Sequence, residues 1–458
     1  MATSLRSLRI CHPAYPFVHL PLRSQAVFRS SRDPMYRHAS TAASPAASAV
    51  VVGAGPGGIT VLGNLLEQLQ AQEQAQSGPV DARRRLVWAD PHFVGGRVNA
   101  RYREVPSNTK VDLFVKFARD VPAFREVVET TPKPNAVTAL QNLPQDQGCQ
   151  LSYAADMCLM LTRGLVRHPG VQQEVGKVTA AVLDQASKTW NITIANKAPI
   201  STPRLVLCTG ANPISKPLPI LQKLSLPHLK PIDLDTALAP SLLSQSFSPD
   251  DDAIVAVVGA SHSAILVLMN LVRLARSSHP RLRVRWFTRN PLRYAEYRDG
   301  WILRDNTGLK GEAAAWARAS LDFERFGAAS PVRDVVARVW TSRDGEDAAY
   351  GAELPGCTHI VQAVGYQQNP LPALQVLDEG QGGVPKPLDV EFDNDSGRFF
   401  RKSEQPEAGR TYLPGLFGAG IAFPERVTDP LGNMEYAVGF WKFMRFAKKV
   451  VPQWVQKP

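Results

Sequence analysis

The chain has few cysteines, and they are scattered. Its 458 residues include five, and none of them forms a CxxC or CxxxxC pair. A redox-active dithiol pair and a Cys-ligated zinc site are therefore not expected, and we predict no metal site. Scattered thiols are typical of a reducing compartment such as the cytosol or the mitochondrial matrix.

Long hydrophobic runs are also missing. No apolar run reaches the ~20 residues that a membrane-spanning helix needs, so no transmembrane segment is expected. Hydrophobic residues make up 44% of the chain and charged residues 20%, which is ordinary for a globular protein. The formal net charge is +11, and six Arg and one Asp in residues 1–45 contribute +5 of it. The charge on the rest of the chain is modest and does not indicate a nucleic-acid partner.

Acidic residues are nearly absent from residues 1–45, which are rich in Arg, Ser and Ala. This composition predicts a mitochondrial transit peptide and a protein of the mitochondrial matrix. The alternative is a disordered N-terminus on a cytoplasmic protein. In both cases we expect the fold to begin after this segment.

Two glycine-rich turns, each between an apolar strand and a helical pattern, are the strongest signals. Such a turn brings backbone N–H groups and a helix N-terminus close to a pyrophosphate. Two turns in separate parts of one chain predict two dinucleotides, most simply a flavin and a nicotinamide. The turn residues are Gly53, Gly55, Gly57 and Gly58 in VVVGAGPGG, and Gly259, Ser261 and Ser263 in VVGASHSA.

The surrounding pattern predicts an α/β fold with two Rossmann-like βαβ domains and an antiparallel β-meander. An FAD-binding domain is expected over residues 46–212 and 355–458, with an NAD(P)H-binding domain, residues 213–354, inserted into it. The meander is expected from three strands at 177–184, 189–195 and 204–207. Further expected elements are helices within 112–170 and 291–329, a loop over 367–395, a strand at 413–419 and an amphipathic helix at 434–450.

Polar and small residues after the second expected strand complete the first site. Asp90 ends LVWAD, where an acid can bind a ribose hydroxyl; the alternative is a helix cap or a turn acid. In FVGGRV, Gly95 and Gly96 would let the backbone approach a diphosphate, and Arg97 could neutralise its charge. The alternative for this doublet is a plain turn.

Together these motifs resemble the two-dinucleotide flavoproteins, which include glutathione-reductase-like enzymes and flavin-containing monooxygenases. The resemblance extends to three further motifs, which are CTGANP with Gly210, AVGYQQNP with Gly365 and TYLPGLFGAG with Gly420. It implies that the first two of these carry the chain between the FAD and nicotinamide domains. The third usually ends in Gly-Asp, but Ile421 stands at the Asp position, which makes Asp429 the candidate for the ribityl contact. A helix after Pro430 would then point its N-terminus at the flavin.

The second turn, GASHSA, resembles the nicotinamide turn of flavin-containing monooxygenases. After the next strand, Arg289 stands where an acid would select NADH, so the sequence predicts NADPH through a pairing with the 2′-phosphate. The alternative for Arg289 is a solvated basic loop. His262, inside the turn, is expected to be structural.

One segment, EVPSNTKVDLF, resembles the monooxygenase segment that places an asparagine beside the flavin. The resemblance implies that Asn108 is catalytic and that its amide hydrogen-bonds nicotinamide or a flavin hydroperoxide. The alternative is an Asn in a turn. The FxGxxxHxxx[WF] fingerprint of flavin-containing and Baeyer–Villiger monooxygenases is absent, and the matching stretch keeps only His228.

We therefore predict an NADPH-using, FAD-dependent enzyme of monooxygenase type. Its flavin C4a-hydroperoxide would oxygenate an N or S atom of a small substrate with O₂. Two alternatives remain, which are an NAD(P)H dehydrogenase that reduces a quinone or a protein acceptor, and a nucleotide-binding redox sensor without turnover.

Overall fold

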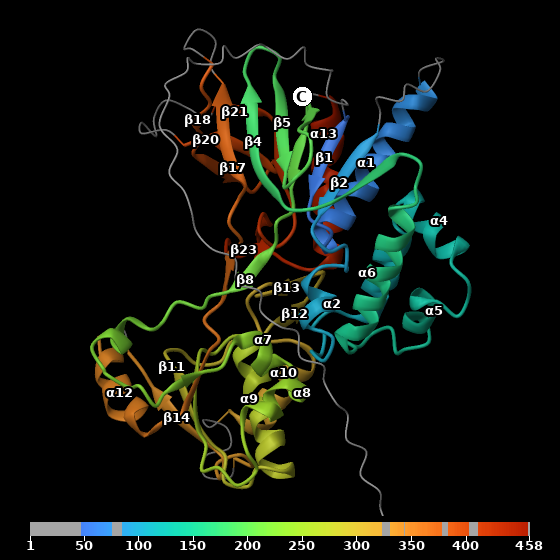
Figure 1. The fold of residues 1–458 in the computed structure, drawn as a ribbon. Helices are drawn as coiled ribbons and strands as arrows, with labels where there is room; N and C mark the ends of the chain where they lie inside the picture. The colour runs from blue at the N-terminus through green and yellow to red at the C-terminus, as the bar shows by residue number, and fades with distance from the viewer. Residues whose placement is uncertain are drawn as a thin grey trace, which may run out of the picture. The chain divides into compact units, whose positions relative to one another are not determined.

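A computed structural model describes residues 47–75, 85–322, 330–342, 344–377, 383–402 and 411–456 (Figure 1). All of these residues belong to one compact unit. The predicted transit peptide lies outside the described residues. Within these ranges, no helix combines the length and the apolar character that crossing a membrane requires.

A seven-stranded sheet contains the first glycine-rich turn. The strand order is β19-β20-β21-β7-β1-β2-β3, and the five strands from β21 to β3 are parallel. The central strands are continuous apolar runs because both of their faces are buried. The strands are β1 (Ala49–Val52), β2 (Leu86–Asp90), β3 (Val171–Val175), β7 (Leu205–Leu207), β19 (Val390–Asp393), β20 (Arg398–Arg401) and β21 (Tyr412–Gly418).

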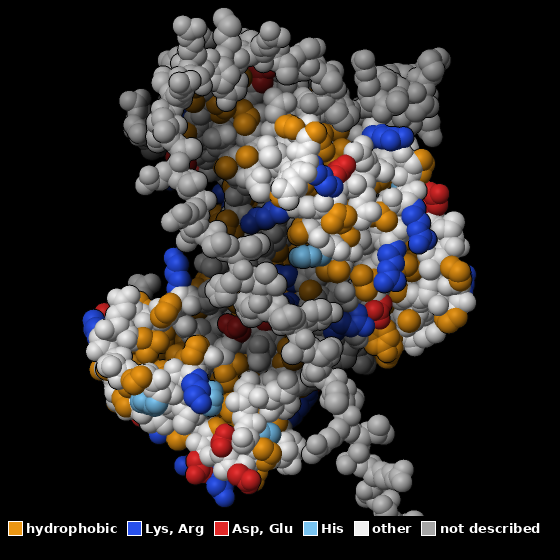
Figure 2. Space-filling view, viewed as in Figure 1, with side chains coloured by type: hydrophobic (Ala, Val, Ile, Leu, Met, Phe, Trp, Pro, Cys, Tyr) orange, Lys and Arg blue, Asp and Glu red, His pale blue; other side chains and the backbone are white. Residues whose placement is uncertain are grey.

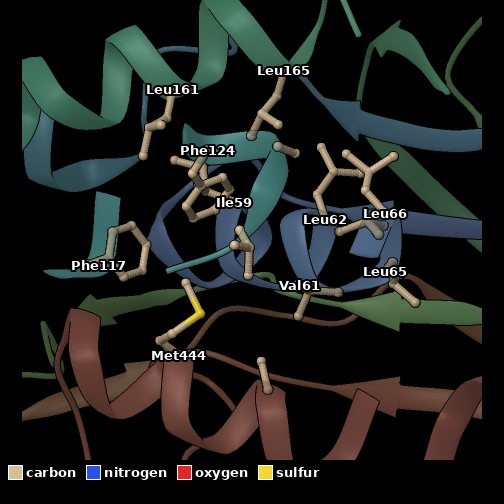
Figure 3. Close-up of a cluster of buried hydrophobic side chains, with 14 of the residues drawn as sticks. Ile59, Val61, Leu62, Leu65, Leu66, Phe117, Phe124, Leu161, Leu165 and Met444 are labelled. Atoms are coloured by element: carbon tan, nitrogen blue, oxygen red, sulfur yellow. The ribbon is translucent and has the colours of Figure 1, made fainter. Parts of the chain in front are cut away.

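Helices pack on this sheet and form the largest hydrophobic cluster (Figure 3). On α1, Ile59, Leu62 and Leu66 recur every three or four residues and so share one face. They pack with Phe124 of α4 and Met444 of α13, which is far away in the sequence. The helices are α1 (Pro56–Ala75), α2 (Arg97–Arg101), α3 (Val111–Arg119), α4 (Pro122–Thr130), α5 (Ala136–Gln141), α6 (Leu151–Leu165) and α13 (Phe440–Gln456).

A second layer contains the expected meander, with one strand exchanged. β4 (Val178–Asp184), β5 (Thr189–Ile194) and β6 (Ile200–Thr202) are antiparallel, whereas the expected third strand at 204–207 is β7 of the first sheet. β17 (Ala373–Leu377) runs parallel beside β4, and β18 (Lys386–Pro387) pairs with β17. The prediction of a loop over 367–395 is therefore wrong, because Leu374 and Val376 are buried against β4.

A five-stranded parallel sheet, in the order β14-β11-β10-β15-β9, contains the second turn. β15, which follows the predicted boundary at residue 354, belongs to this sheet. The elements of this second βαβ unit are β9 (Lys230–Pro231), α7 (Leu234–Leu238), α8 (Pro240–Leu243), β10 (Ile254–Val258), α9 (His262–Ser277), β11 (Arg283–Thr288), β12 (Glu296–Arg298), β13 (Trp301–Leu303), α10 (Gly311–Ser320), β14 (Val336–Trp340), α12 (Glu346–Glu353) and β15 (His359–Gln362), with short 3₁₀ turns at Pro219–Gln222, Ser244–Ser246 and Leu354–Gly356.

Two short strands carry the chain between the first βαβ unit and the second. β8 (Ala211–Pro213) leaves the first unit and pairs antiparallel with β16 (Tyr366–Gln368), which returns to it. Each follows a glycine of positive φ, Gly210 at 75° and Gly365 at 117°. The two motifs expected to connect the domains therefore lie side by side.

Two predicted helices are wrong in part. β22 (Glu425–Thr428) and β23 (Met434–Ala437) form a hairpin, and α13 begins only at Phe440 rather than at Met434. Exposed Met434 and Tyr436 alternate along β23 with buried Ala437, a strand period that overlaps the helical pattern after it. Within the expected helical region 291–329, β12 and β13 form another hairpin, and α10 is the helix.

Basic side chains are dispersed on the face shown in Figure 2. Among the described residues on that face, Lys and Arg alternate with acidic, apolar and other side chains and form no continuous stripe.

Candidate functional site

The first turn is held open by contacts that only glycine allows. Gly53 has a φ of 106°, and a Cβ there would lie 2.3 Å from the carbonyl oxygen of Cys208. The Gly53 N–H donates to the Ala89 carbonyl at 2.8 Å. The Gly53 carbonyl accepts the indole N–H of Trp88 at 2.9 Å. The turn is therefore fixed by β2 on one side and by the end of β7 on the other.

Three distant segments meet at this turn and form a cradle bare of side chains. A Cβ on Gly96, in the GG doublet, would lie 2.6 Å from the Cα of Gly55. A Cβ on Gly57 would lie 2.9 Å from the Cα of Gly420, in the late glycine motif. The start of α1 is thus approached closely by the backbone of the GG doublet and of the late glycine motif, and backbone N–H groups at a helix start are what a diphosphate requires.

Two buried polar atoms beside this cradle have no hydrogen-bond partner among the described residues. They are Oγ1 of Thr209 and Oδ1 of Asn369, in the two connecting motifs. Their neighbouring groups are satisfied, since the Asn369 amide donates to the Thr209 carbonyl at 2.8 Å. Unpaired buried acceptors are costly, and a bound polar ligand supplies partners for such atoms. The residues at the first turn therefore fit a flavin dinucleotide.

Asp90 lies against the first turn at the end of β2. One carboxylate oxygen accepts the Ala54 N–H at 2.8 Å, and the other accepts the N–H groups of His92 and Phe93, each at 2.8 Å. The side chain thus fixes the turn and its own loop, as the turn-acid alternative expects. Its ribose contact stays a prediction, for which one lone pair of Oδ2 remains available.

Arg97 follows the GG doublet, and its charge is already compensated. Its guanidinium pairs with Asp235 of α7 and donates to Asn212 Oδ1 at 2.7 Å. Burial alone would lower the pKa of Arg97, but hydrogen bonds and charges from Tyr102 and Asp235 raise it. The predicted phosphate contact of Arg97 remains untested. Its observed contacts reach the connecting strand β8 and the second unit.

The second turn repeats the construction of the first. Gly259 has a φ of 127°, and a Cβ there would lie 2.4 Å from the Ala363 carbonyl oxygen. The Gly259 N–H donates to the Phe287 carbonyl at 3.0 Å. The Gly259 carbonyl accepts the indole N–H of Trp286 at 2.7 Å. Sequence reading missed both tryptophans, although Trp88 in LVWAD and Trp286 in VRWFT occupy the same place in their units.

The serines of the second turn lie at the start of α9. Ser261 is the N-cap residue with a φ of −85°, so it stands at the second glycine position of the motif without backbone strain. Its side chain makes no capping hydrogen bond, and Ser263 is the second residue of the helix. The N–H groups of this end therefore stay available to a ligand.

Arg289 lies on the surface at the end of β11. Its side chain is 54% exposed, and its guanidinium is 3.7 Å from Glu346 Oε2. Strand register adds a second signal. Val258 pairs with Phe287 as Val52 pairs with Ala89, so Thr288 is the counterpart of Asp90. The second unit thus has a neutral side chain where the first has an acid.

His262 is half-buried at the first position of α9. Its Nδ1 atom has no partner among the described residues. Burial, with a smaller effect of the nearby Lys310 charge, lowers the pKa of His262 to about 4. The imidazole is therefore neutral at pH 7.

The lowered pKa of half-buried His262 predicts a pH dependence of stability. Between pH 6.5 and the folded pKa of about 4, only the unfolded chain binds a proton at this position. The free energy of unfolding therefore decreases as the pH is lowered through this range. From pH 7 to pH 5 we expect a loss of about 2 kcal/mol from this group. Urea unfolding at both pH values should show that the His262→Asn protein does not lose this amount of unfolding free energy between pH 7 and pH 5. His228→Asn, which removes an exposed His, is the control, and equal slopes in all three proteins would contradict the assignment.

Asn108 lies in a short exposed segment between α2 and α3. Its Nδ2 has no hydrogen-bond acceptor among the described residues, and its Oδ1 is 3.5 Å from the Thr109 hydroxyl. The segment is fixed by the Ser107 N–H, which donates to the Cys149 carbonyl at 2.7 Å. On the other side, Gly311 of the second unit is so near that a Cβ there would lie 3.7 Å from the Cα of Asn108.

Asp429 lies at the tip of the β22–β23 hairpin. Its carboxylate accepts the N–H groups of Leu431 and Asn433, each at 2.9 Å, and the Asn433 side-chain amide at 2.8 Å. These bonds lower the pKa of the Asp429 carboxyl and close the turn. No helix directly follows Pro430, so that prediction is corrected; the ribityl role of Asp429 stays an untested prediction with no contact in its favour.

Comparison with known proteins agrees with this geometry. The FAD-NAD(P)-binding family matches residues 50–212, which include the first turn, Asp90, the GG doublet and Gly210. "Monooxygenase AgnR1" of Paecilomyces divaricatus is 50% identical over 413 residues, which cover 89% of this chain and 98% of that protein. The chain belongs to the family of this monooxygenase. Membership confirms the predicted resemblance to two-dinucleotide flavoproteins of monooxygenase type.

Two solved structures resemble this chain more distantly. OTEMO in complex with FAD and NADP is 16% identical, with 54% of this chain and 40% of that chain covered and a TM-score of 0.35. An open crystal structure of cyclohexanone monooxygenase is 17% identical, with 61% and 45% covered and a TM-score of 0.36. The matched part spans less than half of the length of either structure.

Proposed function

We propose that the protein uses NADPH and O₂ to oxygenate a nitrogen or sulfur atom of a small molecule, with FAD as its resident cofactor. One observation carries this proposal. The chain belongs to a monooxygenase family, and its two glycine-rich turns share the same positive-φ geometry and close backbone contacts. When bound, FAD would supply the redox chemistry, taking a hydride from NADPH and reducing O₂, so that one oxygen atom would enter the substrate and the other would leave as water.

The two turns have different partners in this proposal. The backbone N–H groups at the start of α1 bind the FAD diphosphate, and those at the start of α9 bind NADPH. The choice of NADPH over NADH is supported by Thr288, which replaces the acid that would repel a 2′-phosphate, and by the exposed guanidinium of Arg289. An arginine at the strand end gives a phosphate a charge-assisted, bidentate partner.

Asn108 is the proposed catalytic side chain. Its Nδ2 carries two N–H donors that no described residue accepts, on a backbone held from both sides by Ser107 and Gly311. A fixed neutral donor stabilises developing negative charge without adding a proton of its own. We propose that Nδ2 donates to nicotinamide or to the reacting oxygen and so favours transfer to the substrate over release as peroxide.

The visible spectrum and oxygen consumption test the proposed function. We expect a yellow protein whose flavin is bleached by NADPH without oxygen, and faster by NADPH than by NADH. With oxygen and a nucleophilic amine or sulfide, one O₂ should be consumed for each oxygenated product. Rapid reduction of a quinone without O₂ uptake would instead indicate a dehydrogenase. A protein that binds neither nucleotide would contradict both.

Removing the Asn108 amide should uncouple the reaction. In Asn108→Ala we expect flavin reduction by NADPH to stay close to the wild-type rate, while product formation falls by about 100-fold, as for the loss of one preorganised donor. The electrons should appear as hydrogen peroxide. Asn142→Ala, at an exposed helix end, is the matched control. An Asn108→Ala enzyme with the wild-type ratio of product to peroxide would remove Asn108 from the mechanism.

A further inference from the structure

Two acids and two lysines join the second βαβ unit to the first. Asp305 belongs to the turn after β13, in the second unit, and its carboxylate pairs with Lys310 and, at 2.7 Å, with Lys442 of α13. The next residue, Asn306, donates its backbone N–H to Glu435 of β23 at 3.0 Å. The Thr307 hydroxyl donates to the same Glu435 at 2.5 Å. Lys442 and Glu435 lie on α13 and β23 of the first unit, whereas the other residues all belong to the segment 305–310 of the second unit.

The contact continues through Asn306. Its side-chain oxygen accepts Lys442 Nζ at 2.6 Å and the Val438 N–H at 3.4 Å. Val438 lies just before α13, so the turn bridges the β22–β23 hairpin and the start of that helix. The turn after β13 therefore carries backbone and side-chain bonds to the first unit at the same place.

The charged groups of this contact are partly removed from water. The side chains of Lys310, Lys442 and Asp305 are 10%, 24% and 31% exposed. Burial alone would raise the pKa of Asp305, but the two lysines hold it below its usual value. Burial lowers the pKa of Lys442, against the effect of Asp305. Removing the Asp305 charge would leave two lysines without their shared partner, which is costlier than breaking an exposed pair.

The same segment also touches both parts of the candidate site. Lys310 is close enough to His262, at the start of α9, for its charge to lower the pKa of that imidazole. The adjacent Gly311 has a φ of 55° and packs against Ser107 and Asn108. Residues 305–311 are thus fixed to the first unit at one end, and at the other end Gly311 packs on Asn108 while the Lys310 charge acts on His262 of the second turn.

We propose that Asp305 is a positioning residue that locks the nicotinamide-binding unit onto the β22–β23 hairpin and α13, and thereby aligns the second turn with the flavin site of the first unit for hydride transfer. The lock consists of Asp305, Lys310, Glu435 and Lys442. The contacts exist in the chain itself, whereas the effect on hydride transfer rests on the proposed function.

Hydrogen exchange in the protein without nucleotide tests the lock directly. The Asn306 and Val438 amides donate to side chains across the contact, so their exchange reports its opening. In Asp305→Asn we expect both amides to exchange at least about tenfold faster. The matched control is Glu296→Gln, which removes an acid bound to Arg298 and Arg304, each at 2.8 Å, within the second unit. The control should leave both amides unchanged.

Anaerobic flavin reduction by NADPH tests the consequence. In Asp305→Asn we expect the reduction rate to fall about tenfold, with unchanged FAD content and NADP⁺ affinity, because alignment rather than binding is lost. Asp305→Glu should recover part of the rate. Glu435→Gln should reproduce both effects and serves if Asp305→Asn does not fold.

The outcomes separate the lock from the proposed function. Unchanged exchange at both amides overturns the lock, whatever the enzyme activity. Faster exchange with a wild-type rate of flavin reduction overturns the positioning role. If the wild-type protein shows no flavin reduction by NADPH, the proposed function fails, while exchange still decides whether the lock exists.

Discussion

Gly53→Ala should yield a protein that no longer retains FAD. A Cβ at this position would lie 2.3 Å from the Cys208 carbonyl oxygen, on a backbone with a φ of 106° that disfavours alanine. The strain costs roughly 1–3 kcal/mol by itself, and its relief must move the turn or the end of β7. Because the turn binds the diphosphate through its backbone, we expect flavin affinity to fall by at least about 100-fold, or about 3 kcal/mol.

Flavin content after purification and titration of the apoprotein with FAD measure this loss. Gly351→Ala is the control, because a Cβ there meets nothing within 4 Å. If Gly53→Ala does not fold, Gly55→Ala can replace it. A Cβ at Gly55 would lie at an ordinary distance of 3.6 Å from the Cα of Gly96, so this substitution should disturb only a ligand bound at the turn. A Gly53→Ala protein with normal FAD affinity would show that the first turn is not the flavin site.

Gly259→Ala should separate the two nucleotides. A Cβ there would lie 2.4 Å from the Ala363 carbonyl oxygen, at a φ of 127°, so the second turn is disturbed while the first is untouched. We expect a yellow protein with normal FAD content and with NADP⁺ affinity reduced by at least about 100-fold. Its flavin should still be reduced by dithionite and hardly at all by NADPH.

Isothermal titration with NADP⁺ and anaerobic mixing with NADPH provide the measurements. The exposed Gly300 has a φ of 78° and nothing within 4 Å of a Cβ, so Gly300→Ala, in the β12–β13 hairpin, is a control for positive φ without a clash. Loss of FAD from Gly259→Ala, with NADP⁺ binding intact, would reverse the assignment of the two turns.

Local patterns predicted the two βαβ units well. Each combines a β-branched strand, a glycine turn and a helix within about 30 residues, so neighbouring residues carry the whole signal. The pairing partners of β17 and the β22–β23 hairpin were missed because short strands are defined by distant partners. For β17 that partner is β4, nearly 200 residues earlier.

In the candidate site, too, local features were predicted and contacts between distant segments were not. Spacing alone placed Gly53, Gly58 and Gly259, because steric needs of a tight turn leave no other residue. It gave no sign that Arg97 is paired with Asp235, or that Asp305 reaches Lys442, since these contacts depend on how two separate units meet. Asp429 was chosen for its chemistry, but its hydrogen bonds close a local hairpin.

The indole of Trp88 and that of Trp286 each donate to the first glycine of a nucleotide turn. The protein therefore carries one intrinsic fluorophore beside each turn, Trp88 on β2 and Trp286 on β11. Emission from the first is suited to energy transfer to a nearby isoalloxazine ring, and emission from the second to transfer to a reduced nicotinamide. Replacing either tryptophan by phenylalanine would show which part of the fluorescence comes from each turn. Nucleotide binding at the two turns could then be followed independently without an added dye.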